Sequence, residues 1–150
     1  MLTPDFLFTL ANPLAILGWA LLVLAPRWRL TKALVLSGLW PAGLAAAYAA
    51  LIATHYLGGH GAEGGFGSLA QVAALFQDPW ALLAGWVHYL SFDLFVGAWE
   101  ARDAQRRGVP HAALVPALAL TLLVGPVGLL VYFGVRRAFG QQSSATSSSS

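Results

Sequence analysis

Residues 85–111 read GWVHYLSFDLFVGAWEARDAQRRGVPH, and the interpretation of the whole chain depends on this stretch. It begins inside an apolar run, carries His88, Asp93 and Glu100, and ends in arginines followed by a glycine and a proline. This is the composition of a membrane-crossing helix that holds its own ionisable groups. Because an ionisable side chain is costly in hydrocarbon, the stretch also indicates a buried polar site.

The rest of the chain shares this apolar character. Of its 150 residues, 58% are hydrophobic and 9% are charged, which is too apolar for an ordinary soluble domain. A membrane helix needs about 20 mainly apolar residues, and the runs that qualify are approximately 6–24, 33–53, 81–99 and 112–135. We therefore predict an all-α integral membrane four-helix bundle over residues 1–139, followed by a disordered serine-rich tail at 140–150.

The longest predicted connection, between the second and third helices, is rich in glycine. Glycine clusters of this kind favour a flexible or ligand-facing loop, in which we expect His55 and His60 to be solvated. Apolar residues follow at the i, i+3, i+4, i+7 spacing of one helix face, namely Leu69, Val72, Ala73 and Phe76. This spacing predicts a short interfacial helix on the membrane surface.

The basic residues form short clusters near the predicted helix ends rather than one continuous face, which argues against nucleic acid as a partner. Six of the eight Lys and Arg residues fall in the first and third connections, and two follow the fourth predicted helix. The positive-inside rule then places both termini on the non-cytoplasmic side, in a bacterial cytoplasmic or thylakoid-type membrane. The N-terminus has no basic leader, so we expect no cleaved signal peptide. The absence of cysteine excludes disulfides and thiolate metal sites.

The third predicted helix carries its acids on one stripe. At about 100° per residue, Asp93 and Glu100 nearly eclipse, and Tyr89 shares their side of the helix. His88 lies about 140° around from Asp93, so we expect no His–carboxylate metal site and no bound metal. Glu100 and Asp103 lie near the basic end of the helix, where neighbouring arginines are a better match for them than a divalent cation.

Counting the helical rise from each predicted helix end brings further polar residues and prolines to the depth of His88 and Asp93. These are Asn12, the Trp40–Pro41 step, Thr121 and the Gly125–Pro126 step. Prolines free backbone carbonyls and bend helices, so this convergence predicts a cavity near the membrane midplane. Asp93 is then either a proton-transfer group or a structural acid bonded to a neighbour, and both interpretations are also open for His88.

The stretch at 85–111, followed by LTLLVGPVGLLVYFGVRR at 120–137, resembles the membrane protein family named for abscisic-acid deficiency in plants. Asn12, Trp19, the PRW at 26–28 and SLAQVAALFQDPW at 68–80 extend the resemblance over nearly the whole chain. The plant member is linked to the conversion of violaxanthin, an epoxycarotenoid, to neoxanthin, which bears an allene. The resemblance therefore implies a four-helix membrane protein that is associated with carotenoids.

The implied reaction is an isomerisation, because no electrons are gained or lost overall, and it requires no cofactor. A general acid would protonate the epoxide oxygen while a base removes a polyene proton. This is the chemistry of a carotenoid isomerase of the intramolecular oxidoreductase class, and its substrate would be a carotenoid or an apocarotenoid such as retinal. We expect catalytic roles for Asp93, His88 and Glu100, and substrate-binding roles for Asn12, Trp40, Trp86, Tyr89, Thr121 and Pro126.

Two other functions stay open. The same cavity could hold a carotenoid or retinoid without converting it, either alone or as an accessory to a carotenoid enzyme. Intramembrane His, Asp and Glu also mark proton pathways, although the outer half of this chain offers few polar residues for one. Small-residue faces such as Gly125/Gly128 are compatible with a homodimer.

Overall fold

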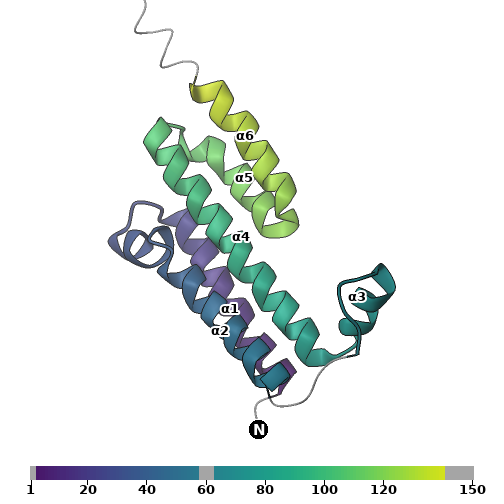
Figure 1. Ribbon diagram of the computed structural model, residues 1–150. Coiled ribbons are helices and arrows are strands. Elements are labelled where there is room, and N and C mark those ends of the chain that lie inside the picture. The colour runs from purple at the N-terminus through teal and green to yellow at the C-terminus, as the bar shows by residue number, and fades with distance from the viewer. Residues whose placement is uncertain (1–2, 58–62, 141–150) are drawn as a thin grey trace, which may run out of the picture. The chain divides into compact units, whose positions relative to one another are not determined.

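The structure, a computed structural model, describes residues 3–57 and 63–140. The helices of this part of the chain follow in order as α1 (Pro4–Leu24), the π-helical turn η1 (Thr31–Leu36), α2 (Leu39–Leu57), α3 (Leu69–Leu75), α4 (Pro79–Arg107), α5 (His111–Val124) and α6 (Pro126–Gly140) (Figure 1). The described residues contain no strand, as the all-α prediction expects. His60 and the serine-rich tail at 141–150 lie outside the described residues.

The helices belong to two compact units, which divide α1 and α4 between them. Unit 1 comprises Met1–Ile16 and Pro41–Phe92, and unit 2 comprises Leu17–Trp40 and Asp93–Ser150. All eight Lys and Arg residues of the chain belong to unit 2, and the sequence of unit 1 has none.

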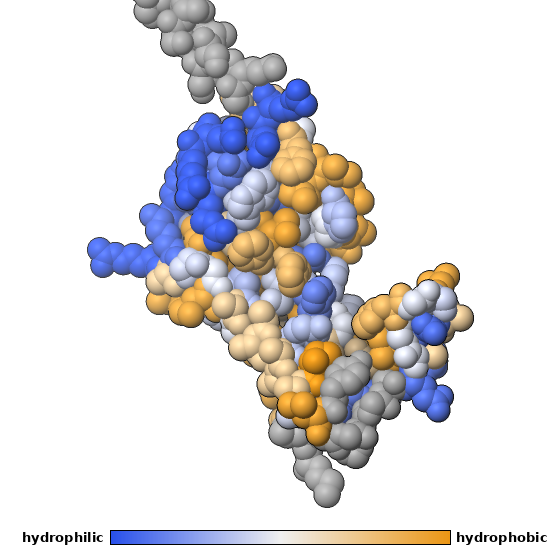
Figure 2. Space-filling model, viewed as in Figure 1, coloured by the Kyte–Doolittle hydropathy of each residue, from blue (hydrophilic) through white to orange (hydrophobic). Residues whose placement is uncertain are grey.

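Two helices, α1 and α4, are long and apolar enough to cross a membrane by length and composition. Large apolar side chains are exposed on α1, among them Phe6, Leu10, Leu14 and Leu17. Figure 2 shows extended hydrophobic surface, with hydrophilic side chains gathered near the C-terminal ends of α4 and α6. Surface of this kind is rare on soluble monomers and is suited to contact with lipid.

The sequence predicts that this helix starts after Asp78–Pro79 and continues to Arg107, with Gly108 just past its end, and local capping fixes both ends of α4 there. Asp78 Oδ1 accepts two backbone N–H bonds of the first turn, each 2.9 Å long, and Pro79 occupies the first helical position. At the other end Gly108 adopts φ +68°, which lets the N–H of Val109 reach the carbonyl oxygen of Ala104 at 2.9 Å. This is the bond of a Schellman motif, so the helix ends at Arg107 for a local reason.

The core of unit 2 joins α1 to α4 through glycines that face large side chains. A Cβ added at Gly97 would lie 2.5 Å from Trp19 Cη2, and one added at Gly18 would lie 2.8 Å from Leu94 Cδ2. Trp19 and Leu94 are both buried. Each helix therefore supplies one glycine and one large residue, which is the small-residue packing expected of membrane helices.

The predicted second span at 33–53 is not one continuous helix. Its first part is η1, which ends at Leu36, and α2 begins after Gly38 at φ +88°. The guanidinium of Arg102 on α4 donates a hydrogen bond to the carbonyl of Leu36 and so satisfies the end of η1. Pro41 does not bend the middle of a helix as expected, because it lies in the first turn of α2, where proline is tolerated.

The predicted fourth span at 112–135 is also interrupted, because α5 and α6 fold back on each other as a helical hairpin (Figure 1). Gly125 at φ +37° makes the reversal, and Pro126 starts α6 at the helical position that suits it best. Helices of 14 and 15 residues are about 21 Å long at 1.5 Å per residue, which is less than about 30 Å of hydrocarbon. The four-helix bundle is therefore not confirmed.

The connection between α2 and α4 differs from its prediction at His55. The short helix α3 forms as predicted, and Ser68 Oγ caps it by accepting the N–H of Gln71 at 3.2 Å. His55 is buried rather than solvated, because α2 continues to Leu57. Its Nε2 lies 3.5 Å from Asp78 Oδ1, so the histidine contacts the cap of α4.

Candidate functional site

Three acids of α4 face the α5–α6 hairpin within unit 2, and we call Asp93, Glu100 and Asp103 the acidic stripe. Asp93 lies at the turn of the hairpin, where a Cβ added at Gly125 would be 3.0 Å from Asp93 Oδ1. Glu100 contacts α5, and Asp103 contacts α6. The prediction that these three side chains share one side of the helix is confirmed.

Glu100 is the most deeply buried of the three, with no exposed surface. The hydroxyl of Thr121 lies 3.0 Å from Oε1 and 3.2 Å from Oε2, and it donates to this carboxyl group. The prediction that arginines satisfy both acids near the end of α4 is therefore wrong for Glu100. The physical reason is the register of the hairpin, which brings the hydroxyl of α5 to the acid inside the apolar part of unit 2.

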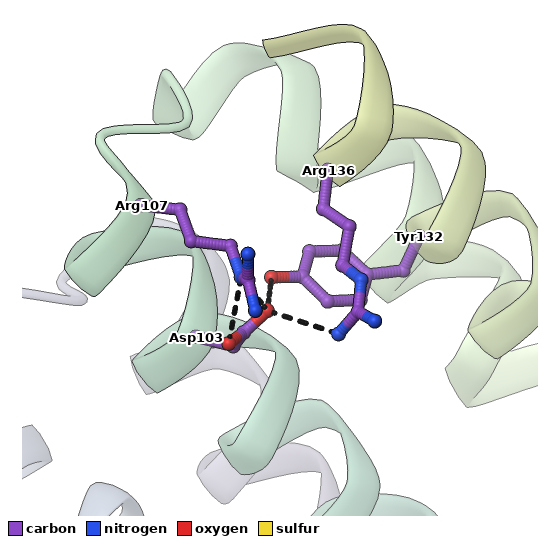
Figure 3. A network of polar contacts seen from close by, with 4 residues as sticks. All are labelled: Asp103, Arg107, Tyr132 and Arg136. Atoms are coloured by element: carbon purple, nitrogen blue, oxygen red, sulfur yellow. Dashed lines mark hydrogen bonds and ion pairs between the residues drawn. The ribbon is translucent and has the colours of Figure 1, made fainter. Parts of the chain in front are cut away.

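Asp103 is the centre of an ionic network that joins α4 to α6 (Figure 3). Arg107 Nε donates to its two oxygens at 3.0 and 2.8 Å, and the hydroxyl of Tyr132 donates to Oδ2 at 2.7 Å. Arg136 Nη1 approaches the same oxygen at 3.5 Å. The predicted arginine partner is thus confirmed for Asp103. The network also holds the second half of α6 beside the last turns of α4. A continuous fourth span would instead have carried that part of the chain away from the end of α4.

The level of Asp93 differs from the predicted one. The depth count placed Thr121 level with Asp93 and the Gly125–Pro126 step level with His88, whereas the structure pairs Thr121 with Glu100 and Gly125 with Asp93. The predicted depths counted the helical rise of each helix separately. In the structure the levels are set by the tight turn at Gly108, because α4 and α5 run side by side from that turn. Asp93 is half-buried and lies where the backbone of the hairpin reverses.

Three predicted binding residues meet in unit 1. The Nε1–H of Trp86 donates to Asn12 Oδ1 at 2.9 Å. The ring of Trp86 lies 5.4 Å from that of Tyr89 and 5.7 Å from that of Phe8, measured between centroids. Trp86 remains 39% exposed, so one side of this aromatic cluster is open to a ligand or to lipid.

His88 belongs to a different surface of unit 1. Its ring stacks on Phe92 at 4.6 Å and meets the ring of Tyr48 edge-on at 5.3 Å. It borders an open groove of about 230 Å³ that also includes Tyr48, Phe66 and Phe76. We call this the aromatic groove.

The predicted site residues divide between the two units. Asn12, Trp86, His88 and Tyr89 belong to unit 1, and Trp40, Asp93, Glu100, Thr121 and Pro126 belong to unit 2. Trp40 is half-buried at the second position of α2, and Pro126 is exposed at the first position of α6. Over residues 3–57 and 63–140, no group of three or more His, Cys, Asp and Glu side chains is placed to hold a metal ion.

The family is decided by residues 6–132, which match the model of the ABA4-like family, described as ABA DEFICIENT 4-like. The chain belongs to this family. The match includes the whole acidic stripe and every predicted site residue, and it confirms the resemblance noted from the motif. No curated protein and no solved structure gives a significant match to the chain. Family membership relates it to the protein of abscisic acid and neoxanthin synthesis and to carotenoid-related membrane proteins.

Two residues of the network around Asp103, Tyr132 and Arg136, do not follow from the predicted spans, because a continuous fourth span would carry them away from the end of α4. The signal that could have located them is the Gly125–Pro126 step. Glycine just past a helix end followed by proline at a helix start is the signature of two helices rather than one.

Proposed function

We propose that this protein is an integral membrane isomerase that acts on a carotenoid or apocarotenoid by proton transfer. The observation that supports this best is the acidic stripe. Asp93 and Glu100 are seven residues apart, which is about 10.5 Å along α4, and both face the α5–α6 hairpin in an apolar part of the chain. Ionisable residues inside membrane segments are rare and mark functional sites by default.

The proposed reaction is the opening of an epoxide next to a polyene to give an allene. A general acid donates a proton to the epoxide oxygen as one carbon–oxygen bond breaks. A base removes a proton from the adjacent polyene carbon, and the electron pair of that carbon–hydrogen bond becomes the new double bond. One proton is added and one removed, so the substrate and product are isomers and the balance needs no redox cofactor.

We assign the first proton transfer to Asp93, because it is half-buried at the turn between α5 and α6, whereas Glu100 has no exposed surface. Glu100, which belongs to the same unit, is the candidate for the second transfer, and the catalytic role of His88 in unit 1 stays a prediction. Glu100 is oriented by the hydroxyl of Thr121, which suits a group that must hold one position. Within the same unit, Trp40, Thr121 and Pro126 would contact the substrate. The binding roles of Asn12, Trp86 and Tyr89, which belong to unit 1, stay predictions.

The experiment is a pigment extraction from protein purified out of a host that makes several carotenoids. Wild type, Asp93→Asn and the matched control Asp5→Asn, which changes an exposed acid in the first turn of α1, are compared by chromatography and absorbance. We expect wild type and the control to yield a carotenoid isomer that the Asp93 variant lacks. Identical pigment profiles from all three proteins would contradict the assignment.

The second candidate function is carotenoid or retinoid binding without conversion, and the aromatic groove favours it. Its volume of about 230 Å³ is below the roughly 300–1,000 Å³ of a typical ligand pocket, so it would take only one end of a polyene. In the same extraction, a binder would carry the same unaltered pigment in wild type and in the Asp93 variant. Tyr48→Ala, in the wall of the groove, would then lower the amount of pigment retained.

We also propose an orientation in a bacterial or thylakoid-type membrane. All eight Lys and Arg residues belong to unit 2, so the positive-inside rule places the basic ends of α4 and α6 on the cytoplasmic side. This revises the expectation for the C-terminal side, which assumed a fourth span. Because the chain has no cysteine, single variants such as Ala138→Cys and Thr3→Cys can be labelled from either side of the membrane. Labelling of Ala138→Cys from outside would contradict the proposal.

A further inference from the structure

Unit 2 contains a recess that is lined by none of the predicted site residues. It is an open cavity of about 570 Å³ between the loop after α1, the last turns of α4 and the start of α5. Its lining includes Leu24, Pro26, Arg27, Lys32, Gln105 and Leu114. We call it the basic cavity, because Arg27 and Lys32 border it and no acidic residue does.

The segment that runs from the last turn of α1 through Arg27 to Lys32 in η1 contacts both neighbouring helices. Gln105 Nε2 on α4 donates to the carbonyl of Pro26 at 3.4 Å, and His111 Nε2 at the start of α5 lies 2.8 Å from the carbonyl oxygen of Val23. The position of the cations therefore follows from contacts that the helices themselves make. A preorganised charged loop loses less conformational entropy on binding than a loose one.

The two cations of the basic cavity differ from other arginines of unit 2, which are paired with a carboxylate. Arg107 and Arg136 both contact Asp103. By contrast, within residues 3–57 and 63–140 neither Arg27 nor Lys32 takes part in an ion pair with a carboxylate. Two cations that share one recess and have no acid beside them favour an anion as occupant.

The rest of the lining indicates what kind of anion this is. Leu24 and Leu114 supply apolar wall beside the cations. Trp28 also borders the cavity and is 52% exposed, as expected of a tryptophan at a membrane interface. A volume of about 570 Å³ is far larger than a single phosphate ion needs and lies in the roughly 300–1,000 Å³ range of small-molecule sites.

We propose that the basic cavity binds a phosphate-bearing anionic amphiphile, with the phosphate between Arg27 and Lys32 and the apolar part against Leu24 and Leu114. Basic pockets between helices on the cytoplasmic side of membrane proteins bind anionic lipid headgroups in this way. The inference goes beyond the proposed function and shares only its membrane setting. The site is separate from the acidic stripe, so either proposal can fail without the other.

The test uses the full chain purified in detergent and mixed with equal amounts of phosphatidylglycerol and phosphatidylcholine, with bound lipid counted by native mass spectrometry. Inorganic phosphate alone is measured in parallel by equilibrium dialysis, which distinguishes a free ion from a lipid headgroup. The test variant is Arg27→Gln/Lys32→Gln. The control, Arg29→Gln/Arg106→Gln, removes two cations that do not line the cavity and leaves the same net charge as the test variant.

We expect wild type and the control to retain phosphatidylglycerol in preference to phosphatidylcholine. Each cation near an anionic headgroup contributes about fivefold in affinity, so the test variant should bind phosphatidylglycerol about 30-fold more weakly. If wild type also binds inorganic phosphate and the test variant does not, the phosphate site is supported, with a free phosphate ion rather than a lipid as its ligand. Equal retention of both lipids by wild type, or equal losses in the test and control variants, would overturn the proposal.

Discussion

The substitution Gly128→Ala tests the close approach of α5 and α6. A Cβ added at Gly128 would lie 2.1 Å from the backbone nitrogen of Thr121 and 2.2 Å from its Oγ1. Ordinary contacts between such atoms begin near 3.5 Å, so the helices would have to separate by roughly 1 Å or more. Backbone atoms cannot move aside as a side chain can. The change would therefore displace the hydroxyl that Glu100 accepts from.

The size of the effect follows from three contributions. Overpacking of a tight contact costs about 1–3 kcal/mol, and loss of the hydrogen bond to the buried Glu100 costs about 1–3 kcal/mol. Replacing a helical glycine by alanine favours the helix by about 1 kcal/mol, which offsets part of this loss. We expect a net loss of about 1–5 kcal/mol. The matched control is Gly134→Ala on the same helix, where nothing lies within 4 Å of the added Cβ and where the stability should stay the same or rise by up to about 1 kcal/mol.

Unfolding in mixed detergent micelles, followed by circular dichroism, measures both variants against wild type. The difference between two Gly→Ala changes six residues apart removes the effects of composition and of micelle conditions. Gly128→Ala should be less stable than Gly134→Ala by at least about 2 kcal/mol on the contributions above. Two variants of equal stability would refute the close packing of the hairpin and, with it, the placement of Thr121 beside Glu100.

Three further predictions concern single contacts. Thr121→Val keeps the shape of the side chain but removes the hydroxyl from Glu100, and it should cost about 1–3 kcal/mol in the same unfolding assay, whereas Thr121→Ser should restore most of it. Tyr132→Phe removes one donor from Asp103, and a loss of about 1 kcal/mol is expected, since two arginines remain; a loss above about 2 kcal/mol would contradict this account. Ser68→Ala removes the N-cap of α3, and hydrogen exchange should speed up in α3 alone, by the equivalent of about 1 kcal/mol.

The parts of the fold that sequence predicts well are those fixed by local chemistry. The start of α4 at Pro79 and its end before Gly108 depend on residues within one turn of each boundary, and both are confirmed. The shared side of Asp93, Glu100 and Asp103 depends only on helical periodicity, and it is confirmed as well.

The parts that sequence does not predict depend on contacts between distant segments. Hydropathy is the same whether the run at 112–135 crosses a membrane once or folds back at its middle. The difference depends on Gly125 at φ +37° and on the room that Gly128 leaves for Thr121. The partner of Glu100 and the network around Asp103 follow from that fold-back, so they could not be identified before it was known. The burial of His55 was missed for a similar reason, because its contact with Asp78 joins two helices.

The fold-back of α5 and α6 has a consequence for how the chain enters a membrane. A fourth span would carry Arg136 and Arg137 across the hydrocarbon, at about 2.5–3.5 kcal/mol for each arginine at the helix centre. If the hairpin inserts as a unit, the uncharged turn at 124–127 is the part that enters the hydrocarbon first. Arg136 and Arg137 then stay on the side from which the hairpin enters. In the orientation proposed above, α5 and α6 would insert from the cytoplasmic side after α4 is in place. Closure of the hairpin on α4 is then the step of assembly that buries Glu100.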